Sequence, residues 1–332
     1  MSNMRNNLIA LAGMLALCFT LLPAQVRVGS PYSRFGVGDL HRISNARLLS
    51  MGGTSIAQRD NVLINYWNPA SYTSFDSLSF VFEGGITDHY ATTRTADLSS
   101  SNNYISLGYL LFGFPLTSWW KASVGLLPFS DVGYNISYEE VHPEAGPLSY
   151  LFKGNGGINQ FYFGSGFRIT PKLSLGFNLA YLFGTLDKSR AVYFNDTAYS
   201  FNLRISNRLT YGDLLPGFGL QYHTGLPDNH FLNVGVTYGP QTNLQTSQDQ
   251  LALTFTTGAT GIEFIKDTIS SGEEAGDVTF PGSYGLGLMY GKTDSWEAVM
   301  DARMQNWDDY RYFGIRDSLR NSFQVSGGFA WV

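Results

Sequence analysis

The chain has 332 residues and a formal net charge of −5, with 14% charged residues, 15% aromatic residues and 37 glycines. Soluble domains usually contain about 25% charged residues, so this composition argues against a soluble globular class. The modest net charge and the lack of any Lys/Arg cluster exclude nucleic acid from the expected partners.

The N-terminus has the layout of a secretory signal peptide. Arg5 precedes an apolar run over residues 8–22, which is shorter than the roughly 20 residues of a membrane-spanning helix. We expect residues 1–24 to be removed after export. The only cysteine, Cys18, lies inside this run. The mature chain is therefore expected to lack disulfides, thiol catalysis and thiolate metal sites.

Residues 25–76 form a segment that is irregular by local signals but too apolar for a solvated linker. A glycine pair permits positive φ, and an Asn-Pro-Ala turn interrupts regular structure. Apolar side chains such as Ile56 and Trp67 require a wall around them. We therefore predict a plug, called the hatch below. Its defining residues are Met51, Gly52, Gly53, Asp60, Asn68, Pro69 and Ala70.

From residue 77 the hydrophobic period changes to two, which is the pattern of strands with one face in lipid. In Leu173–Tyr181 the odd positions are large and apolar, and the even positions are small or polar. Residues 77–332 are therefore predicted to form an antiparallel transmembrane β-barrel of about ten strands. The predicted strands are 77–91, 102–114, 119–138, 156–170, 173–194, 197–224, 231–255, 279–292, 295–308 and 322–332.

The predicted connections alternate between two sides of the membrane. Short turns around residues 116–118, 170–172, 226–229 and 292–294 fall on the periplasmic side. Long loops over 139–155, 256–278 and 309–321 fall on the outside. Short inner turns and long outer loops are the known asymmetry of outer-membrane barrels.

Two strands depart from regularity. Pro128 cannot donate to a sheet ladder, so the third strand is expected to have a bulge, a kink or a gap in pairing. The residues of this expected kink are Gly125, Leu127, Pro128, Phe129, Asp131 and Gly133. In the sixth strand the outward side changes from the odd positions of residues 201–205 to the even positions of residues 218–222. A bulge near Gly212–Pro216 would explain that change.

Charged residues expected to face the lumen are Arg168, Glu297, Asp301 and Arg303. They either hold the hatch, contact a ligand headgroup or simply pair with one another inside the barrel. The five histidines have no metal-ligand spacing, and no serine lies in a recognisable nucleophile turn. We therefore expect no enzyme activity, no cofactor and no metal.

The order of these features resembles the FadL family of outer-membrane channels for hydrophobic compounds (OMPP1/FadL/TodX). The resemblance rests on Met51-Gly52-Gly53, a following Asp60, and Asn68-Pro69-Ala70 before the first strand. Residues 30–40 look like the start of the mature chain in the Bacteroidetes branch of that family. The resemblance implies a Gram-negative outer-membrane location and passive, hatch-gated uptake of small, fatty-acid-like hydrophobic molecules. It also implies lateral exit beside a kinked strand, which we place at Leu126–Phe129, with Asn68-Pro69-Ala70 packed against Pro128.

The sequence leaves a second function open. FadL-like barrels also serve type IX secretion, where a PorV-like protein binds partners and transports no small molecule. Expected partners are therefore outer-membrane lipid, an apolar small molecule and the barrel assembly machinery, with secretion-system proteins as a further possibility. A sealed lumen would favour the docking role over transport.

The resemblance also implies about fourteen strands. The width of the lumen gives a separate reason to expect more than ten: a barrel of about eight strands is filled by its own side chains, and ten would leave little room for a hatch. Phe329 and Trp331 are expected to face lipid, and the sequence stops at Val332 within a strand pattern. We therefore expect about four further strands after residue 332.

Overall fold

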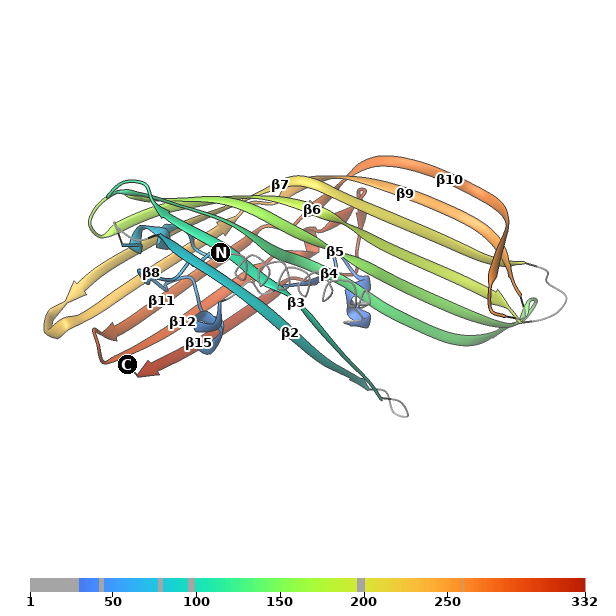
Figure 1. The fold of residues 1–332 in the computed structure, drawn as a ribbon, viewed down its shortest axis with the longest axis horizontal. Helices are drawn as coiled ribbons and strands as arrows, with labels where there is room; N and C mark the ends of the chain where they lie inside the picture. The colour runs from blue at the N-terminus through green and yellow to red at the C-terminus, as the bar shows by residue number, and fades with distance from the viewer. Residues whose placement is uncertain are drawn as a thin grey trace, which may run out of the picture.

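The computed structural model describes residues 30–41, 45–76, 80–94, 99–195, 201–258 and 260–331. The predicted signal peptide and Cys18 lie outside these residues, as does the start of the first predicted strand at 77–79. One antiparallel sheet dominates the fold (Figure 1). Its long strands are β2 (Val81–Arg94), β3 (Ser99–Pro115), β4 (Trp120–His142), β5 (Gly146–Arg168), β6 (Leu173–Phe194), β7 (Asn202–Leu226), β8 (His230–Gly239), β9 (Thr242–Thr257), β10 (Glu263–Phe280), β11 (Ser283–Lys292), β12 (Trp296–Gln305) and β15 (Ser322–Trp331).

The remaining elements are short. In the N-terminal segment they are η1 (Pro31–Arg34), β1 (Asp39–Leu40), α2 (Ala46–Ser50) and η2 (Pro69–Ser74). Later in the chain they are η3 (Pro227–Asn229), η4 (Trp307–Asp309), β13 (Arg311–Tyr312) and β14 (Ile315–Arg316).

Some of these strands are halves of one longer strand. β8 and β9 both run antiparallel to β7, on its C-terminal and N-terminal halves respectively. β10 and β11 pair with β9 and β8 in the same way. The long strands therefore occupy ten positions across the sheet, as the sequence predicted. β2 and β15 are the outermost strands along the pairings recorded for the described residues.

The alternation that predicted the strands corresponds to two different environments. In β12 the odd residues Glu297, Val299 and Asp301 are buried, whereas Met300 is 57% exposed on the outer face. Exposed Phe, Leu, Tyr and Met side chains recur on that face from strand to strand. Such a surface is stable in lipid and unfavourable in water, so the all-β transmembrane class follows from the pattern.

The bulge predicted within the sixth long strand, β7, was wrong. Its register with β6 runs from Leu203 to Tyr222 with no shift. Leu209, Tyr211 and Gln221 are all buried at odd positions, so the inward side never changes. Residues 203 and 205 share that inward side and do not face lipid. The sequence pattern misled because apolar residues there pack inward, while Arg208 points out to solvent.

The irregularity predicted at Pro128 is present. Pairing between β3 and β4 ends at Leu126, and the register between β4 and β5 shifts between Pro128 and Ser130. The missing neighbour is replaced by β1, which pairs with Ser130 and Asp131. Because proline has no N–H, Pro128 leaves one fewer backbone donor without a partner at this gap in the ladder.

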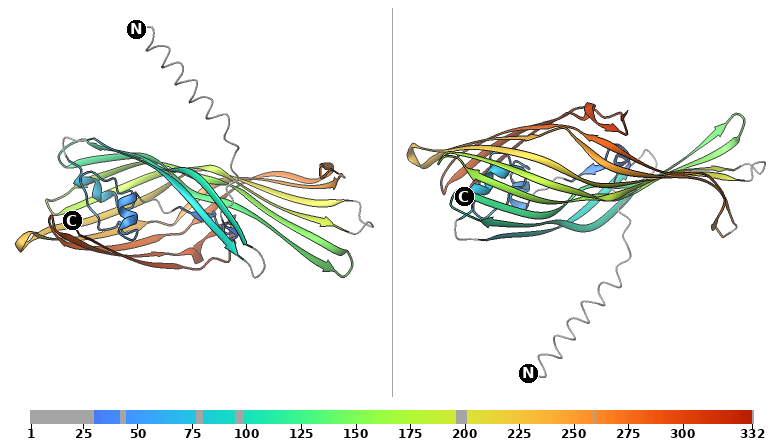
Figure 2. Two further views of the ribbon diagram at one scale, coloured as in Figure 1. Left: turned by 60° about the horizontal axis from the view of Figure 1, so that its bottom comes forward. Right: turned by 90° about the horizontal axis from the view of Figure 1, so that it is seen from above.

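The long outer loops were predicted wrongly, except for the last. β4 and β5 extend through 139–142 and 146–155, and β10 occupies 263–280. Only residues 309–321 are mostly irregular, with the small β13–β14 hairpin inside them. Strand residues beyond the lipid can be polar on both faces because water covers both, so alternation no longer marks them. Figure 2 shows these hairpins extending from one end of the molecule.

The N-terminal segment lies inside the concave face of the sheet (Figure 2). Close approach is possible because inward positions are glycine. A Cβ at Gly176 of β6 would lie 2.4 Å from the carbonyl carbon of Pro69, and one at Gly235 of β8 would lie 2.1 Å from the Ile56 carbonyl oxygen. The wall glycines at which a Cβ would meet the hatch are Gly113, Gly164, Gly166, Gly176, Gly219, Gly235, Gly285, Gly287 and Gly328. The lack of side chains at these positions leaves room for the hatch against the wall.

Candidate functional site

The Asn68-Pro69-Ala70 turn caps η2 and docks on the wall. Asn68 is fully buried; its Oδ1 accepts from the Ala70 amide at 3.2 Å, and its Nδ2 donates to the carbonyl oxygens of Ile56 (2.7 Å) and Leu220 (3.3 Å). Pro69 fixes φ at the first position of η2, where a missing N–H costs nothing. The turn thus ties two parts of the hatch to β7.

The predicted contact between this turn and Pro128 is wrong. The turn lies against Gly166, Gly176 and Gly219 on β5, β6 and β7. The kink in β4 is instead covered by the chain around β1, where His41 Nε2 lies 2.6 Å from Asp131 Oδ2. The prediction failed because the backbone groups exposed at the kink pair with the backbone of β1 and need no amide side chain.

The predicted kink residues all lie at this junction. Leu127 is fully buried against the hatch side of the wall, next to the close contact between Gly125 and Tyr162. Phe129 packs against Phe280, with 5.5 Å between ring centroids. Gly133 accepts from Ser30 through its carbonyl and donates its amide to Ser33 Oγ, both at 3.1 Å.

The four predicted lumenal charges all contact the hatch. Asp301 is 2% exposed, and its Oδ2 accepts from the amides of Ser55 (2.6 Å) and Ile56 (2.9 Å). Arg303 lies 3.6 Å from the same carboxylate and donates to Ser55 Oγ. Its guanidinium also lies 4.5 Å from the centre of the Trp67 ring. The Asp301 carboxylate thus holds the hatch loop at Ser55 and Ile56, and the Arg303 guanidinium holds the Trp67 ring.

The other two predicted lumenal charges, Glu297 and Arg168, contact two further parts of the hatch. Glu297 pairs with Arg47 at 3.3 Å, and Arg47 also pairs with Asp60 at 3.3 Å. Arg168 donates to the Thr73 carbonyl oxygen at 2.8 Å. Charge-assisted hydrogen bonds of this kind are roughly twice as strong as neutral ones.

Met51, Gly52 and Gly53 form the end of α2. Met51 is 2% exposed and packs with Met289 and Val299. Gly52 and Gly53 have φ of 71° and 74°, a region that residues with a Cβ rarely adopt. A Cβ at Gly52 would also lie 2.3 Å from the carbonyl oxygen of Gly327 in β15. Glycine is therefore required there for both conformation and space.

Arg59 is a hatch cation that the sequence analysis missed. It donates to Gln221 Oε1 at 2.9 Å and to Thr73 Oγ1 at 3.0 Å. Burial, and secondarily the neighbouring Arg168, lower the pKa of Arg59 to about 10. Neutral oxygen atoms accept the hydrogen bonds of its charged group, and these bonds tie the hatch loop at Arg59 to β7 and to η2.

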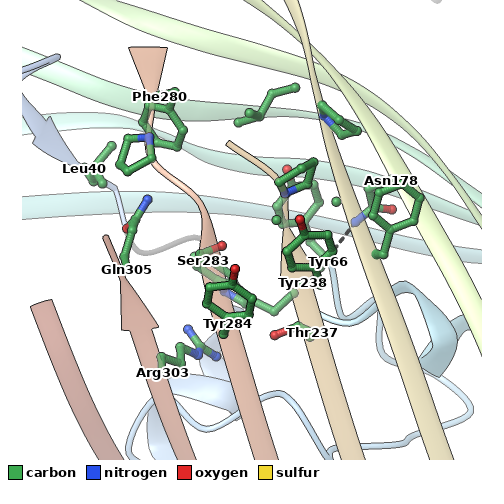
Figure 3. A pocket seen from close by; sticks show the side chains of 18 of the residues that line it. Leu40, Tyr66, Asn178, Thr237, Tyr238, Phe280, Ser283, Tyr284, Arg303 and Gln305 are labelled. Atoms are coloured by element: carbon green, nitrogen blue, oxygen red, sulfur yellow. Dashed lines mark hydrogen bonds between the residues drawn. The ribbon is translucent and has the colours of Figure 1, made fainter. Parts of the chain in front are cut away.

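A cavity of about 330 Å³ lies beside the hatch and reaches both faces of the wall (Figure 3). Its inner lining includes Gln160, Asn178 and Arg303. Its outer lining includes the exposed rings of Phe218, Tyr238 and Tyr284. Those rings form a row with centroid separations of 6.4 Å and 5.4 Å.

The wall is interrupted at the level of this cavity. Pairing of β7 passes from β8 to β9 between Phe218 and Tyr211, which leaves residues 212–217 outside both ladders. The neighbouring strands break at residues 240–241 and 281–282. Each interruption contains a cavity-lining proline, and these are Pro216, Pro240 and Pro281. Because proline has no N–H, the gap leaves fewer unpaired donors facing an apolar medium. We call this interruption the wall opening.

The lumen on the far side of the cavity from η2 is closed by packed side chains. Val37 of the N-terminal segment is buried among wall residues such as Leu182 and Tyr211. Tyr310 and Phe280 belong to the same cluster, with Trp307 and Leu319 packed against it. Lys188 donates to the carbonyl oxygens of Arg34 (3.0 Å) and Gly36 (3.1 Å), which fixes this part of the chain.

Sequence reasoning missed the wall opening. It singled out Pro216 as a local bulge and gave no role to Pro240 or Pro281. The available signal was a proline in each of three successive strands, but their alignment appears only when the register is known. Among the described residues, no group of three or more His, Asp or Glu is placed to hold a metal ion, and no helix is long and apolar enough to span a membrane.

The fold defines a class of protein, an antiparallel transmembrane β-barrel with an N-terminal segment inside the concave face of its sheet. A family model described as BamG matches residues 4–329. The chain therefore belongs to the BamG family. This family differs from the FadL family that the sequence resembles, but the predicted likeness to the FadL-type fold is supported by the structures described next. No curated protein matches the chain.

Solved structures support the likeness of fold. The toluene transporter TodX of Pseudomonas putida is similar with a TM-score of 0.54 and 18% identity, over 90% of this chain and 81% of TodX. A FadL homologue of Pseudomonas aeruginosa matches with a TM-score of 0.35 and 12% identity, over 84% of this chain and 83% of the homologue. The TodX match shows that the chain shares the fold of this toluene transporter.

Proposed function

We propose that this protein binds small hydrophobic, fatty-acid-like molecules in the wall cavity and passes them passively into the outer membrane. The observation that carries the proposal is the cavity itself, which joins inward residues beside the hatch to outward aromatic rings at a gap in the ladder. An apolar compound gains roughly 0.8 kcal/mol for each CH₂ that leaves water. Exit into the bilayer therefore needs no energy source beyond a gradient.

This proposal moves the lateral exit from the β4 kink to the wall opening. The kink is closed by β1, whereas the wall opening has no backbone ladder across residues 212–217. Entry from outside requires the packed cluster around Val37 to rearrange, and Val37 is the member of that cluster that comes from the N-terminal segment. The hatch, which includes Val37, is therefore proposed as the gate.

Gly217 provides a direct test. It lines the cavity, and a Cβ built there meets nothing within 4 Å. Gly217→Trp should therefore fill the cavity without disturbing the wall, and uptake of an apolar tracer should fall about tenfold or more at equal surface level. Gly225→Trp is the matched control, because Gly225 lies on the same strand, also faces open space and does not line the cavity. Equal uptake by the two variants would refute the proposed route.

A docking role is the second candidate function. The family name BamG suggests a link to the barrel assembly machinery, and the packed lumen supports a barrel that is not an open channel. Secretion-system proteins are the alternative partners for such a barrel. If docking is the function, depletion of the protein should lower the folded, heat-modifiable fraction of other outer-membrane barrels. Gly217→Trp should restore that fraction fully, although it blocks the cavity.

Two parts of the proposal rest on the sequence. Residues 1–24 are proposed to direct export, followed by cleavage and insertion into a Gram-negative outer membrane. The start of the mature chain resembles that of a Bacteroidetes branch with the FadL-type fold, and we propose that the protein comes from this branch.

A further inference from the structure

The floor of the wall cavity contains a buried amide group without a partner. Gln160 of β5 is 0% exposed and lines the cavity. Its Oε1 accepts from the Tyr66 hydroxyl at 3.0 Å, but its Nε2 has no hydrogen-bond partner. An unsatisfied buried donor is destabilising, so such a group in a cavity indicates a missing acceptor.

The orientation of this amide follows from its neighbour. Exchanging the oxygen and nitrogen of Gln160 would leave the Tyr66 O–H without its acceptor and would also leave the glutamine oxygen unpaired. The observed orientation satisfies the hydroxyl and leaves one unsatisfied group instead of two. The unpaired group is therefore the N–H donor.

Three other polar side chains that line the cavity, those of Asn178, Arg303 and His41, already have partners. Asn178 accepts from the Tyr72 hydroxyl at 3.0 Å and donates to the Tyr66 carbonyl oxygen at 2.7 Å. Arg303 is paired with Asp301, and His41 is paired with Asp131. The two lining side chains that can carry positive charge therefore each face a carboxylate. An anion entering the cavity would lose its hydration without gaining an unpaired cation.

From these contacts we infer that the cavity selects neutral compounds that join an apolar body to a carbonyl-type acceptor, such as an ester, in preference to hydrocarbons and to carboxylate anions. The acceptor oxygen lies at Gln160 Nε2, and the apolar body extends past Phe218, Tyr238 and Tyr284 toward the lipid. The inference rests on the proposed function and narrows its ligand class, from fatty-acid-like molecules in general to uncharged ones such as their esters. It also separates this cavity from a site for an aromatic hydrocarbon, which has no acceptor oxygen.

The test compares methyl octanoate with undecane, which has a similar length and no acceptor, and with octanoate. Each compound displaces a fluorescent apolar probe from the full chain in lipid nanodiscs. Partition into the bilayer differs between compounds, so the measured quantity is the ester-to-undecane affinity ratio in each protein. Comparing that ratio between proteins cancels the partition term.

Gln160→Met keeps the side-chain volume and removes the donor. We expect its ester-to-undecane ratio to be about fivefold to tenfold lower than that of the unchanged protein, which is the effect of one lost hydrogen bond. The double variant Tyr66→Phe with Gln160→Met should show the same ratio, because it leaves no hydroxyl unsatisfied. Gln250→Met, at an exposed position of β9 outside the cavity, should keep the original ratio.

Three results overturn the inference, and they distinguish a wrong ligand class from a wrong function. If ester and undecane both bind, but with the same ratio in the unchanged protein and in Gln160→Met, the ligand class is wrong and the cavity still binds apolar compounds. The same holds if octanoate binds most tightly. If no compound displaces the probe from the unchanged protein, the proposed function itself fails.

Discussion

Removal of the Asp301 carboxylate should release the hatch loop at Ser55 and Ile56 while the barrel stays folded. The carboxylate is 2% exposed and accepts two backbone N–H groups at 2.6 and 2.9 Å. Asp301→Ala deletes the oxygen that accepts both bonds, leaves two buried donors unpaired, and removes the counter-charge of Arg303. No ladder bond of β12 involves the side chain, so the wall should keep its pairing.

The magnitude follows from the two contacts. Hydrogen bonds to a charged group contribute about 1.5 to 3 kcal/mol each, so the two together contribute about 3 to 5 kcal/mol after partial relaxation. Every 1.4 kcal/mol changes an equilibrium constant about tenfold. The open population of this loop should therefore rise between about 100-fold and 3000-fold in Asp301→Ala. Asp301→Asn keeps one acceptor and the shape, so its increase should be about tenfold.

Hydrogen–deuterium exchange measured by mass spectrometry is the direct assay, because the exchange rate of the 54–57 amides reports their opening. Heat-modifiability in detergent establishes that the barrel remains folded. Asp249→Ala serves as the control, since Asp249 is exposed on β9 and touches no hatch residue. If the folded Asp301→Ala protein exchanges at 54–57 as slowly as the unchanged protein, the carboxylate does not hold the hatch.

Two further changes test how the hatch is seated. Gly176→Leu should displace η2, because a Cβ at Gly176 would lie 2.4 Å from the Pro69 carbonyl carbon; proteolysis within 65–75 should become rapid, and protection equal to that of Gly225→Leu would contradict the packing. Asn68→Ala should destabilise the same turn by about 2 to 3 kcal/mol, because it removes the cap of η2 and the bond to Ile56. Exchange of the 69–75 amides should then rise about 30-fold or more, and an unchanged rate would show that Asn68 is not the anchor.

Local signals in the sequence were sufficient for the class of fold. Alternation with a period of two identified the membrane-spanning strands, because one face of such a strand contacts lipid and the other faces the lumen. Turn residues marked the four short connections at 116–118, 170–172, 226–229 and 292–294, which the structure also has. The irregular but apolar character of residues 25–76 predicted a segment inside a wall. Each of these features depends on a residue and its near neighbours in the chain.

The same local signals failed where the environment changes. β10 continues into a region with water on both sides, so Glu273 and Glu274 interrupt the alternation without ending the strand. In β7 the sequence analysis assigned the odd positions of residues 201–205 to the lipid-facing side, although residues 203 and 205 share the inward side with the buried Leu209. Hydrophobicity identifies a buried residue but does not say whether lipid or protein buries it.

Only the tertiary structure decided where the hatch docks and where the wall opens. Asn68 found its partners on Ile56 and Leu220, and the kink at Pro128 was covered by β1, because any segment of suitable shape can satisfy exposed backbone groups. Pro240 and Pro281 became neighbours through the strand register, which is fixed by pairing between distant residues. The unpaired amide of Gln160 likewise results from contacts across the lumen. None of these relations is local, so the sequence alone did not determine them.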